Sequence, residues 1–168
     1  MENETVNKTI ILHKICCGLS FSNNSLVVGL RHDEIHIVDL EGNTLKSIHV
    51  QSKSNLYHLV YLDNRVIYSD IVGRTVSCVD ESGTQIWEYT HDLAVPRGLC
   101  SDTYGNIIIV DYCSVIVISK DGKDSKTLLG REEGLEQMNY ICFENDESYG
   151  IVCDSKGFTL TKFNLTYE

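Results

Sequence analysis

Short runs of β-branched and other apolar residues alternate with turn residues along most of the chain. The clearest stretch is 96–129, where strands are predicted at residues 97–101, 107–111, 115–119 and 125–129. Gly-Asn and Asp-Gly pairs lie between these runs, and such pairs favour tight hairpins because Gly and Asn adopt positive φ at little cost. Connections of a few residues require neighbouring strands to be antiparallel. The stretch therefore predicts a four-stranded antiparallel meander.

The same unit recurs along the sequence. Three glycines follow an apolar run and a polar turn, with a spacing of about 40 residues: Gly42, Gly83 and Gly122. Three acids end the second strand of successive units at a similar spacing: Asp70, Asp111 and Asp154. A period near 40 with four strands is typical of a propeller blade, and each blade needs neighbours to cover its two apolar faces. We therefore predict an all-β fold, a β-propeller of about four four-stranded antiparallel blades.

Residues 1–168 are predicted to form a single propeller region, which the repeat divides into blades. The blades are expected at residues 18–50, 57–90, 97–129 and 140–165. Residues 9–14 predict a stray outer strand, and the last unit lacks its own outer strand. Pairing residues 9–14 with the last blade would close a compact four-bladed ring. We favour the other interpretation, in which the chain is part of a larger propeller and its open blade edges promote self-association.

Charge narrows the classes of partner. The 24 acidic and 14 basic side chains give a net charge of −10, which opposes attraction to nucleic acids and anionic membranes. No apolar run approaches the roughly 18 residues that a membrane span needs, and the first residues are acidic and polar, unlike a secretory signal. We expect a cytoplasmic protein that binds neither nucleic acid nor membrane.

Neither the cysteines nor the histidines have metal-ligand spacing. The seven cysteines lie mostly in apolar runs without a Cys-x₂-Cys pair, so free, buried cysteines are expected. The adjacent Cys16 and Cys17 could form a strained disulfide or a metal-sensing pair, although we favour the structural interpretation. His32 and His36 would lie about 13 Å apart along a strand. We expect no metal and no cofactor.

The recurring acids are expected to stabilise turns and not to form a metal or catalytic site. A ring formed by Asp70, Asp111 and Asp154 could bind a cation, but an Asp at a strand end readily accepts hydrogen bonds from a neighbouring turn. The sequence contains no Gly-x-Ser-x-Gly elbow and no phosphate-binding glycine loop. We therefore expect no catalytic residues and no enzymatic activity.

The third unit resembles an NHL repeat, in particular the diverged propellers at the C-terminus of tripartite-motif (TRIM) proteins. The resemblance rests on residues 95–100 (Val-Pro-Arg-Gly-Leu-Cys), 105–106 (Gly-Asn), 109–111 (Ile-Val-Asp) and 120–122 (Lys-Asp-Gly). It is specific over residues 95–165 and loose before them, and the fourth unit has Met138-Asn139-Tyr140 in place of Pro-Arg-Gly. The resemblance implies about six blades and recognition of substrates for ubiquitin ligation by a RING domain, which these residues do not contain.

Together these features favour a non-catalytic protein-interaction module whose loop face docks a protein partner. We expect the contacts to involve Arg97, Tyr112, Arg74 and Trp87. For Tyr112 and Trp87, packing in the core or between blades is the competing interpretation. Two other functions stay open: a lactonase-like metal-dependent hydrolase propeller, which needs a central carboxylate cluster, and an RNA-binding NHL module, which needs a basic patch with stacking aromatics.

Overall fold

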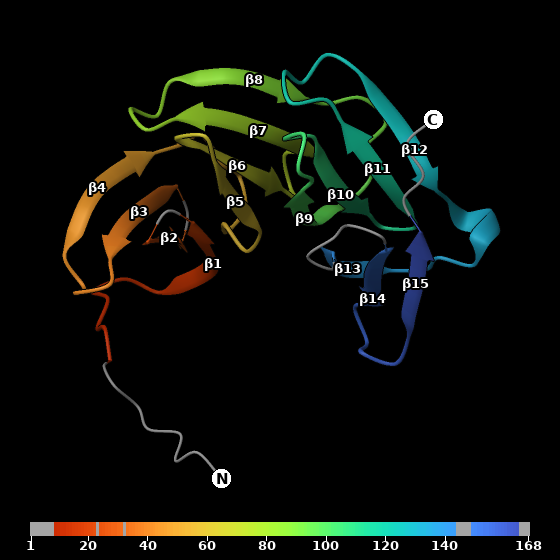
Figure 1. Ribbon diagram of the computed structural model, residues 1–168, viewed down its shortest axis with the longest axis horizontal. Coiled ribbons are helices and arrows are strands. Elements are labelled where there is room, and N and C mark those ends of the chain that lie inside the picture. Colours follow the sequence, from red (N-terminus) through yellow and green to blue (C-terminus); the bar gives the residue numbers. More distant parts are fainter. Residues whose placement is uncertain (1–8, 23, 32, 144–148, 165–168) are drawn as a thin grey trace, which may run out of the picture.

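Four antiparallel sheets, one per blade, lie around a common centre in the computed structural model (Figure 1). The structure describes residues 9–22, 24–31, 33–143 and 149–164. Three sheets have four strands, and three strands of the last sheet are described. The predicted all-β propeller of about four blades is confirmed, whereas the six blades implied by the family resemblance are not what the structure shows. No helix in the described ranges has the length and apolarity to cross a membrane.

The strands of each blade run in chain order from the innermost to the outermost, and each pairs only with its neighbours in sequence. The first blade contains β1 (Cys16–Ser22), β2 (Ser25–Leu30), β3 (Glu34–Asp39) and β4 (Thr44–His49). The second contains β5 (Leu59–Leu62), β6 (Arg65–Asp70), β7 (Thr75–Asp80) and β8 (Gln85–Tyr89). The third contains β9 (Pro96–Ser101), β10 (Ile107–Asp111), β11 (Ser114–Ile118) and β12 (Ser125–Leu129). The fourth contains β13 (Met138–Phe143), β14 (Tyr149–Asp154) and β15 (Leu160–Asn164), after a short 3₁₀ helix, η1 (Arg131–Glu133).

Asp-x-x-Gly turns close the outer hairpins of the first two blades. Gly42 and Gly83 have φ of 88° and 85°, a left-handed conformation that glycine adopts without steric cost. The acid that opens each turn also caps it: the Asp39 carboxylate accepts a hydrogen bond from the Asn43 N–H at 2.8 Å, and the Asp80 carboxylate accepts one from Ser82 N–H at 2.8 Å. The repeated motif therefore marks a turn that needs both of its end residues.

Each pair of neighbouring blades encloses its own apolar core. The first and second blades bury Val27 and Ile35 against Tyr68, and the next two cores lie between the second and third and between the third and fourth blades. On β10, Ile109 belongs to the core with the second blade and the adjacent Ile108 to the core with the fourth. This alternation follows from the two-residue period of a strand, and it makes the middle blades apolar on both faces.

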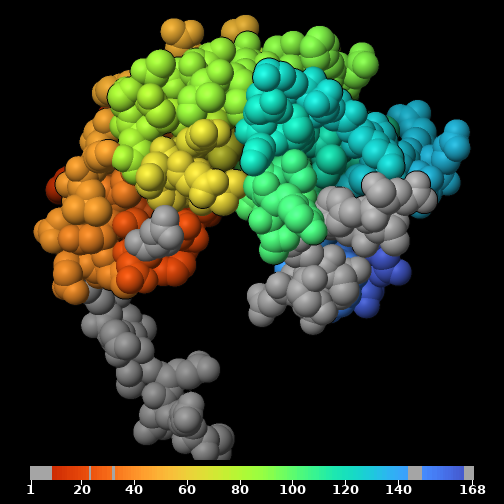
Figure 2. All heavy atoms as spheres, turned by 45° about the horizontal axis from the view of Figure 1, so that its top comes forward, coloured from red at the N-terminus to blue at the C-terminus, as the bar shows by residue number. Residues whose placement is uncertain are grey.

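The prediction of a strand at residues 9–14 is wrong. These residues form no strand; instead Leu12 packs against Val28, Leu30 and Val38 on a face of the first blade. Lys14 anchors the segment there through an ion pair with Glu34. The segment covers an apolar face of the sheet instead of extending its edge, because that face has no neighbouring blade. It therefore does not close a ring, and the body remains an arc that is open between the first and fourth blades (Figures 1 and 2).

Candidate functional site

The recurring acids have structural partners. Asp111 is 4% exposed, and its carboxylate accepts hydrogen bonds from the backbone N–H groups of Ala94 and Val95, which lead into β9. Asp70 likewise accepts bonds from the Lys53 N–H and the Ser54 hydroxyl, ahead of β5. Burial works to raise the pKa of Asp70, but these hydrogen bonds outweigh it, so the pKa lies below its usual value.

Asp154 differs from these two acids. Its carboxylate accepts a bond from Phe158 N–H at 2.9 Å, within the turn that follows it, and not from a linker between blades. The three acids therefore do not converge on one point. Across the described ranges, no three His, Cys, Asp or Glu side chains come together in a way that could hold a metal ion.

Arg97 lies where the inner strands meet. Its side chain leaves the start of β9, and its Nη1 donates a hydrogen bond to the Asn139 side-chain oxygen of β13 at 2.9 Å. Its Nε is buried without a hydrogen-bond partner among the described residues, and its guanidinium forms no salt bridge with any of them. Buried polar groups are nearly always hydrogen-bonded, so this cation stands out as a candidate binding group.

Aromatic side chains line a hollow beside the start of β9. The His58 ring packs edge-on against Tyr140, with 5.2 Å between ring centroids. Burial and the nearby Arg97 cation lower the pKa of His58 to about 4, so the ring is neutral at physiological pH. Tyr57 and Tyr140 are 49% and 56% exposed. They line a hollow of about 170 Å³ that also takes residues from the innermost strands of the first and third blades.

Gly98 lets the third and fourth blades approach closely at this point. A Cβ on Gly98 would lie 2.6 Å from the Asn139 carbonyl oxygen and 2.8 Å from the Tyr140 Cα. Both are backbone atoms, which cannot swing aside as a flexible side chain can. The Pro-Arg-Gly sequence therefore combines the Arg97 cation with a small residue, Gly98, that allows β13 and its Asn139 to lie close to β9.

Two other predicted contact residues lie on the same loop face as Arg97. Tyr112 is in the β10–β11 turn and Arg74 is in the β6–β7 turn, both with positive φ (47° and 57°). These turns are next to the starts of the inner strands, since Asp111 pairs with Pro96. Tyr112 lines a separate hollow with Arg131 and Glu136. The structure places these residues on one face without bringing them into one site.

Trp87 lies apart from them, between the second and third blades. It is 9% exposed, and its indole N–H donates to the Lys120 carbonyl at 3.2 Å. Gly122 rests against the indole, where a Cβ would come within 2.6 Å of the ring. This is the packing role that competed with partner binding in the sequence interpretation.

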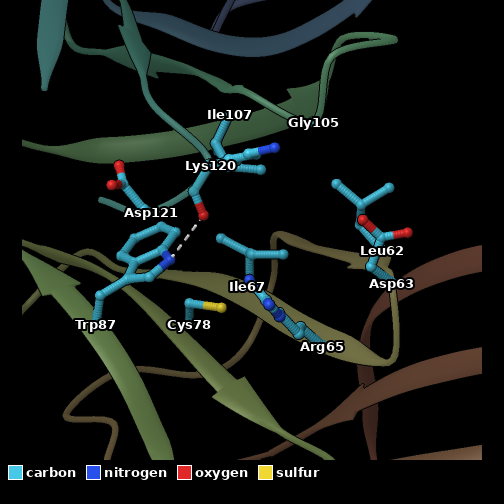
Figure 3. Close-up of a pocket in the computed structure, with 10 residues that line it drawn as sticks. All are labelled: Leu62, Asp63, Arg65, Ile67, Cys78, Trp87, Gly105, Ile107, Lys120 and Asp121. Carbon is cyan, nitrogen blue, oxygen red and sulfur yellow. Dashed lines mark hydrogen bonds between the residues drawn. The ribbon is translucent and has the colours of Figure 1, made fainter. Parts of the chain in front are cut away.

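A second pocket, not anticipated from the sequence, opens beside Trp87 (Figure 3). It has a volume of about 260 Å³, and the Arg65 and Lys120 cations share its lining with Asp63 and Asp121. Asp121 also pairs with Lys123 at 3.3 Å. The β5–β6 and β11–β12 turns form its rim, so it opens on the face opposite Arg97. Because the lining carries both cations and carboxylates, the pocket favours neither an anionic nor a cationic ligand.

All seven cysteines are free, as expected, but their burial was overestimated. Only Cys78 is fully buried, and burial raises its pKa to about 11. Cys16 and Cys142 are exposed. Cys16 and Cys17 form no disulfide. Of the two histidines considered as ligands, His36 hydrogen-bonds to Glu34 at 2.8 Å, while His32 lies outside the described residues.

Comparison with known proteins supports the fold alone. No family model matches the chain, and neither does any curated protein, so the NHL and TRIM resemblance stays a prediction. Among solved structures, the computationally designed Ika4 protein is similar over 99% of this chain and 100% of its own, with a TM-score of 0.69 and 17% identity. The designed Ika8 protein matches 89% of this chain with a TM-score of 0.66 and 16% identity. A streptogramin B lyase also matches 89%, with a TM-score of 0.65 and 14% identity. This chain spans about half of the last two, 46% and 54%.

Proposed function

We propose that this protein is a non-catalytic interaction propeller and that a protein partner docks on its loop face around Arg97. The observation that carries the proposal is the Arg97 guanidinium, which has Asn139 as a neutral partner and no salt bridge among the described residues. Arginine and tyrosine are the residue types that most often dominate binding energy at interfaces. Tyr57 and Tyr140, each about half exposed, line the hollow beside Gly98, the residue that follows Arg97 on β9.

The chemistry of the guanidinium indicates which group it would accept. A planar guanidinium binds a carboxylate through two parallel hydrogen bonds, so the docked group would be an acidic side chain or a C-terminal carboxylate. The net charge of −10 disfavours bulk attraction of an acidic partner. Recognition would therefore depend on local contacts at Arg97 and would discriminate among acidic sequences.

The resemblance of residues 95–165 to TRIM propellers supports a more specific role. In this role the propeller would be the substrate-recognition part of a TRIM-type E3 ubiquitin ligase, with the transfer performed by a RING domain elsewhere. A TRIM-type RING fused to this chain should then ubiquitinate a bound partner, and the reaction should require Arg97. Equal modification by the Arg97→Ala fusion would contradict this role.

Peptide selection tests the docking site without a known partner. Immobilised full-length chain is screened against a random displayed-peptide library, and the selected peptides are titrated against wild type, Arg97→Ala and Arg97→Lys. We expect acidic peptides, a dissociation constant raised about 10- to 100-fold by Arg97→Ala, and partial binding by Arg97→Lys. Lys126→Ala, a charge loss at an exposed site on β12, is the matched control and should leave binding unchanged. Peptides that bind Arg97→Ala as well as wild type would overturn the proposal.

A further inference from the structure

Within the described residues, the two ends of the arc expose sheet faces that no neighbouring blade covers. The first-blade end face carries Leu19 and Phe21, which are 62% and 60% exposed, beside the portion covered by Leu12. The fourth-blade end face carries Tyr140, Ile151 and Leu160, of which Tyr140 and Leu160 are 56% and 75% exposed. Apolar side chains of this size are normally covered when they gather on one face of a sheet.

Both end faces repeat faces that are buried inside the molecule. The strand registers show this when the central rung of each sheet is compared, a rung being a row of residues paired across neighbouring strands. Ile151, on the fourth-blade end face, pairs with Cys142 and Lys162 in the way that Ile67 pairs with Val60 and Cys78 in the second blade. Ile67 and Cys78 are buried against the third blade. The fourth-blade end face is thus of the type that packs on a following blade.

The first-blade end face is of the complementary type. Its rung Leu19, Val28 and His36 corresponds in register to Leu99, Ile109 and Ile116 of the third blade. Those three residues are buried in the core shared with the second blade. The described residues therefore contain three interfaces in which one type of face packs on the other. One face of each type has no blade on it, and Leu12 covers part of the first-blade face.

We propose that two copies of this chain associate head to tail, with the fourth-blade end face of one copy packed on the first-blade end face of the other. The occupant is a second copy because each end face has the strand register of the type that packs on the other within the same chain, and its central rung carries apolar residues, Leu19 and Val28 on one face and Ile151 on the other. The contact is heterologous, so it can extend from copy to copy until the ends meet. Leu12 covers part of the first-blade end face, which leaves Leu19 and Phe21 as its main free contacts.

Sedimentation of the full chain tests this proposal. Under reducing conditions, wild type should shift from monomer to oligomer over about 1 to 100 µM. Leu160→Asp and Phe21→Asp each spoil one end face and should raise the dissociation constant at least tenfold. Val72→Asp is the control, because Val72 is 65% exposed in the β6–β7 turn, away from both end faces. Circular dichroism confirms that each variant is folded.

Mixing the two variants decides the orientation. Each retains one intact end face, so Leu160→Asp mixed with Phe21→Asp should form a one-to-one dimer that neither forms alone and that does not grow further. A wild type that stays monomeric across the concentration range would overturn the proposal, since the end faces would then be free or reserved for other blades. Association that the mixture fails to restore would overturn it as well, because a symmetric contact would then be involved.

Discussion

The middle and end blades are built to the same pattern but have different surroundings. In the third blade, Ile108 and Ile109 on β10 are both 0% exposed because neighbouring blades cover both faces of the sheet. In the fourth blade, Val152 on β14 is 0% exposed while Ile151 beside it is only partly buried. The same alternation of apolar residues thus makes two buried faces in one blade and one in the other. Stability should therefore be concentrated in the middle of the arc.

The largest expected effect comes from emptying a core between blades. Ile108→Ala removes a fully buried side chain between the third and fourth blades and should lower the free energy of unfolding by about 2 to 5 kcal/mol. Ile151→Ala, the same change at a matched position of the fourth-blade end face, should cost less than half as much. Urea denaturation of both variants measures the difference, and equal losses would remove the distinction between middle and end blades.

The next effect comes from overpacking the closest approach of two blades. Gly98→Ala places a Cβ about 2.6 Å from the Asn139 carbonyl oxygen and should cost about 1 to 3 kcal/mol. It should also weaken peptide binding, because Arg97 and Asn139 would be displaced. In the control Gly130→Ala, the new Cβ meets nothing nearer than the Glu133 carboxylate at 3.7 Å, so stability should hardly change. A stable Gly98→Ala would show that the blades can separate without penalty.

A smaller loss of stability is expected when the recurring acids are replaced, and it should differ between Asp111 and Asp154. Asp111→Ala leaves the N–H groups of Ala94 and Val95 without the buried Asp111 carboxylate as acceptor and should cost about 1 to 3 kcal/mol. Asp154→Ala loses a bond within an exposed turn and should cost less. Thermal denaturation of the two variants provides the comparison. A larger loss at Asp154 would contradict the structural role assigned to Asp111.

A further expected effect is a dependence of stability on pH that arises from His58 at the centre of the arc. His58 has a pKa of about 4 in the folded state against an ordinary value of 6.5. In that window the unfolded chain binds a proton that the folded chain excludes, so stability falls as the pH drops from 6.5 towards 4. His58→Phe should flatten this part of the profile. An NMR titration should also show a higher His58 pKa in Arg97→Ala, and an unchanged value would mean that the two side chains do not interact.

The stability contributed by Glu34 in the first blade should be lost at a lower pH than that affected by His58. Hydrogen bonds from Lys14 and His36 lower the pKa of Glu34 to about 2, against 4.5 ordinarily. The stability from this carboxylate is therefore present above pH 4.5 and lost as the pH falls towards 2. Glu34→Gln should remove that loss and leave the His58 window intact. If Glu34→Gln instead altered the range from pH 6.5 to 4, the two sites would be coupled.

The sequence predicted the blades well because their determinants are local. Alternating apolar runs and the Asp-x-x-Gly turn at Gly42 or Gly83 specify a hairpin within a few residues, and the repeat spacing then specifies the stacking of blades. Residues 9–14 were mispredicted because an apolar β-branched run shows only that the segment will be covered. Whether Leu12 joins a sheet edge or lies on a sheet face depends on which surface is uncovered in three dimensions.

The candidate site was predicted only in part. The sequence indicates Arg97 as a contact residue, but it shows Asn139, one repeat later at the equivalent strand position, only as a departure from the Pro-Arg-Gly pattern. Aligning inner-strand starts would have placed Tyr57, Arg97 and Asn139 in one row at the centre. The contact of His58 with Tyr140 could not be predicted, because it joins blades that are not consecutive. It depends on how tightly the arc curves.

Amide hydrogen exchange, followed by mass spectrometry on dilute protein below its association range, tests the central claim most directly. If the middle blades are covered on both faces and the end blades on one, β6, β7, β10 and β11 should exchange most slowly, and β1, β14 and β15 several-fold faster. Equal protection in all four blades, or slower exchange at the ends than in the middle, would contradict the account.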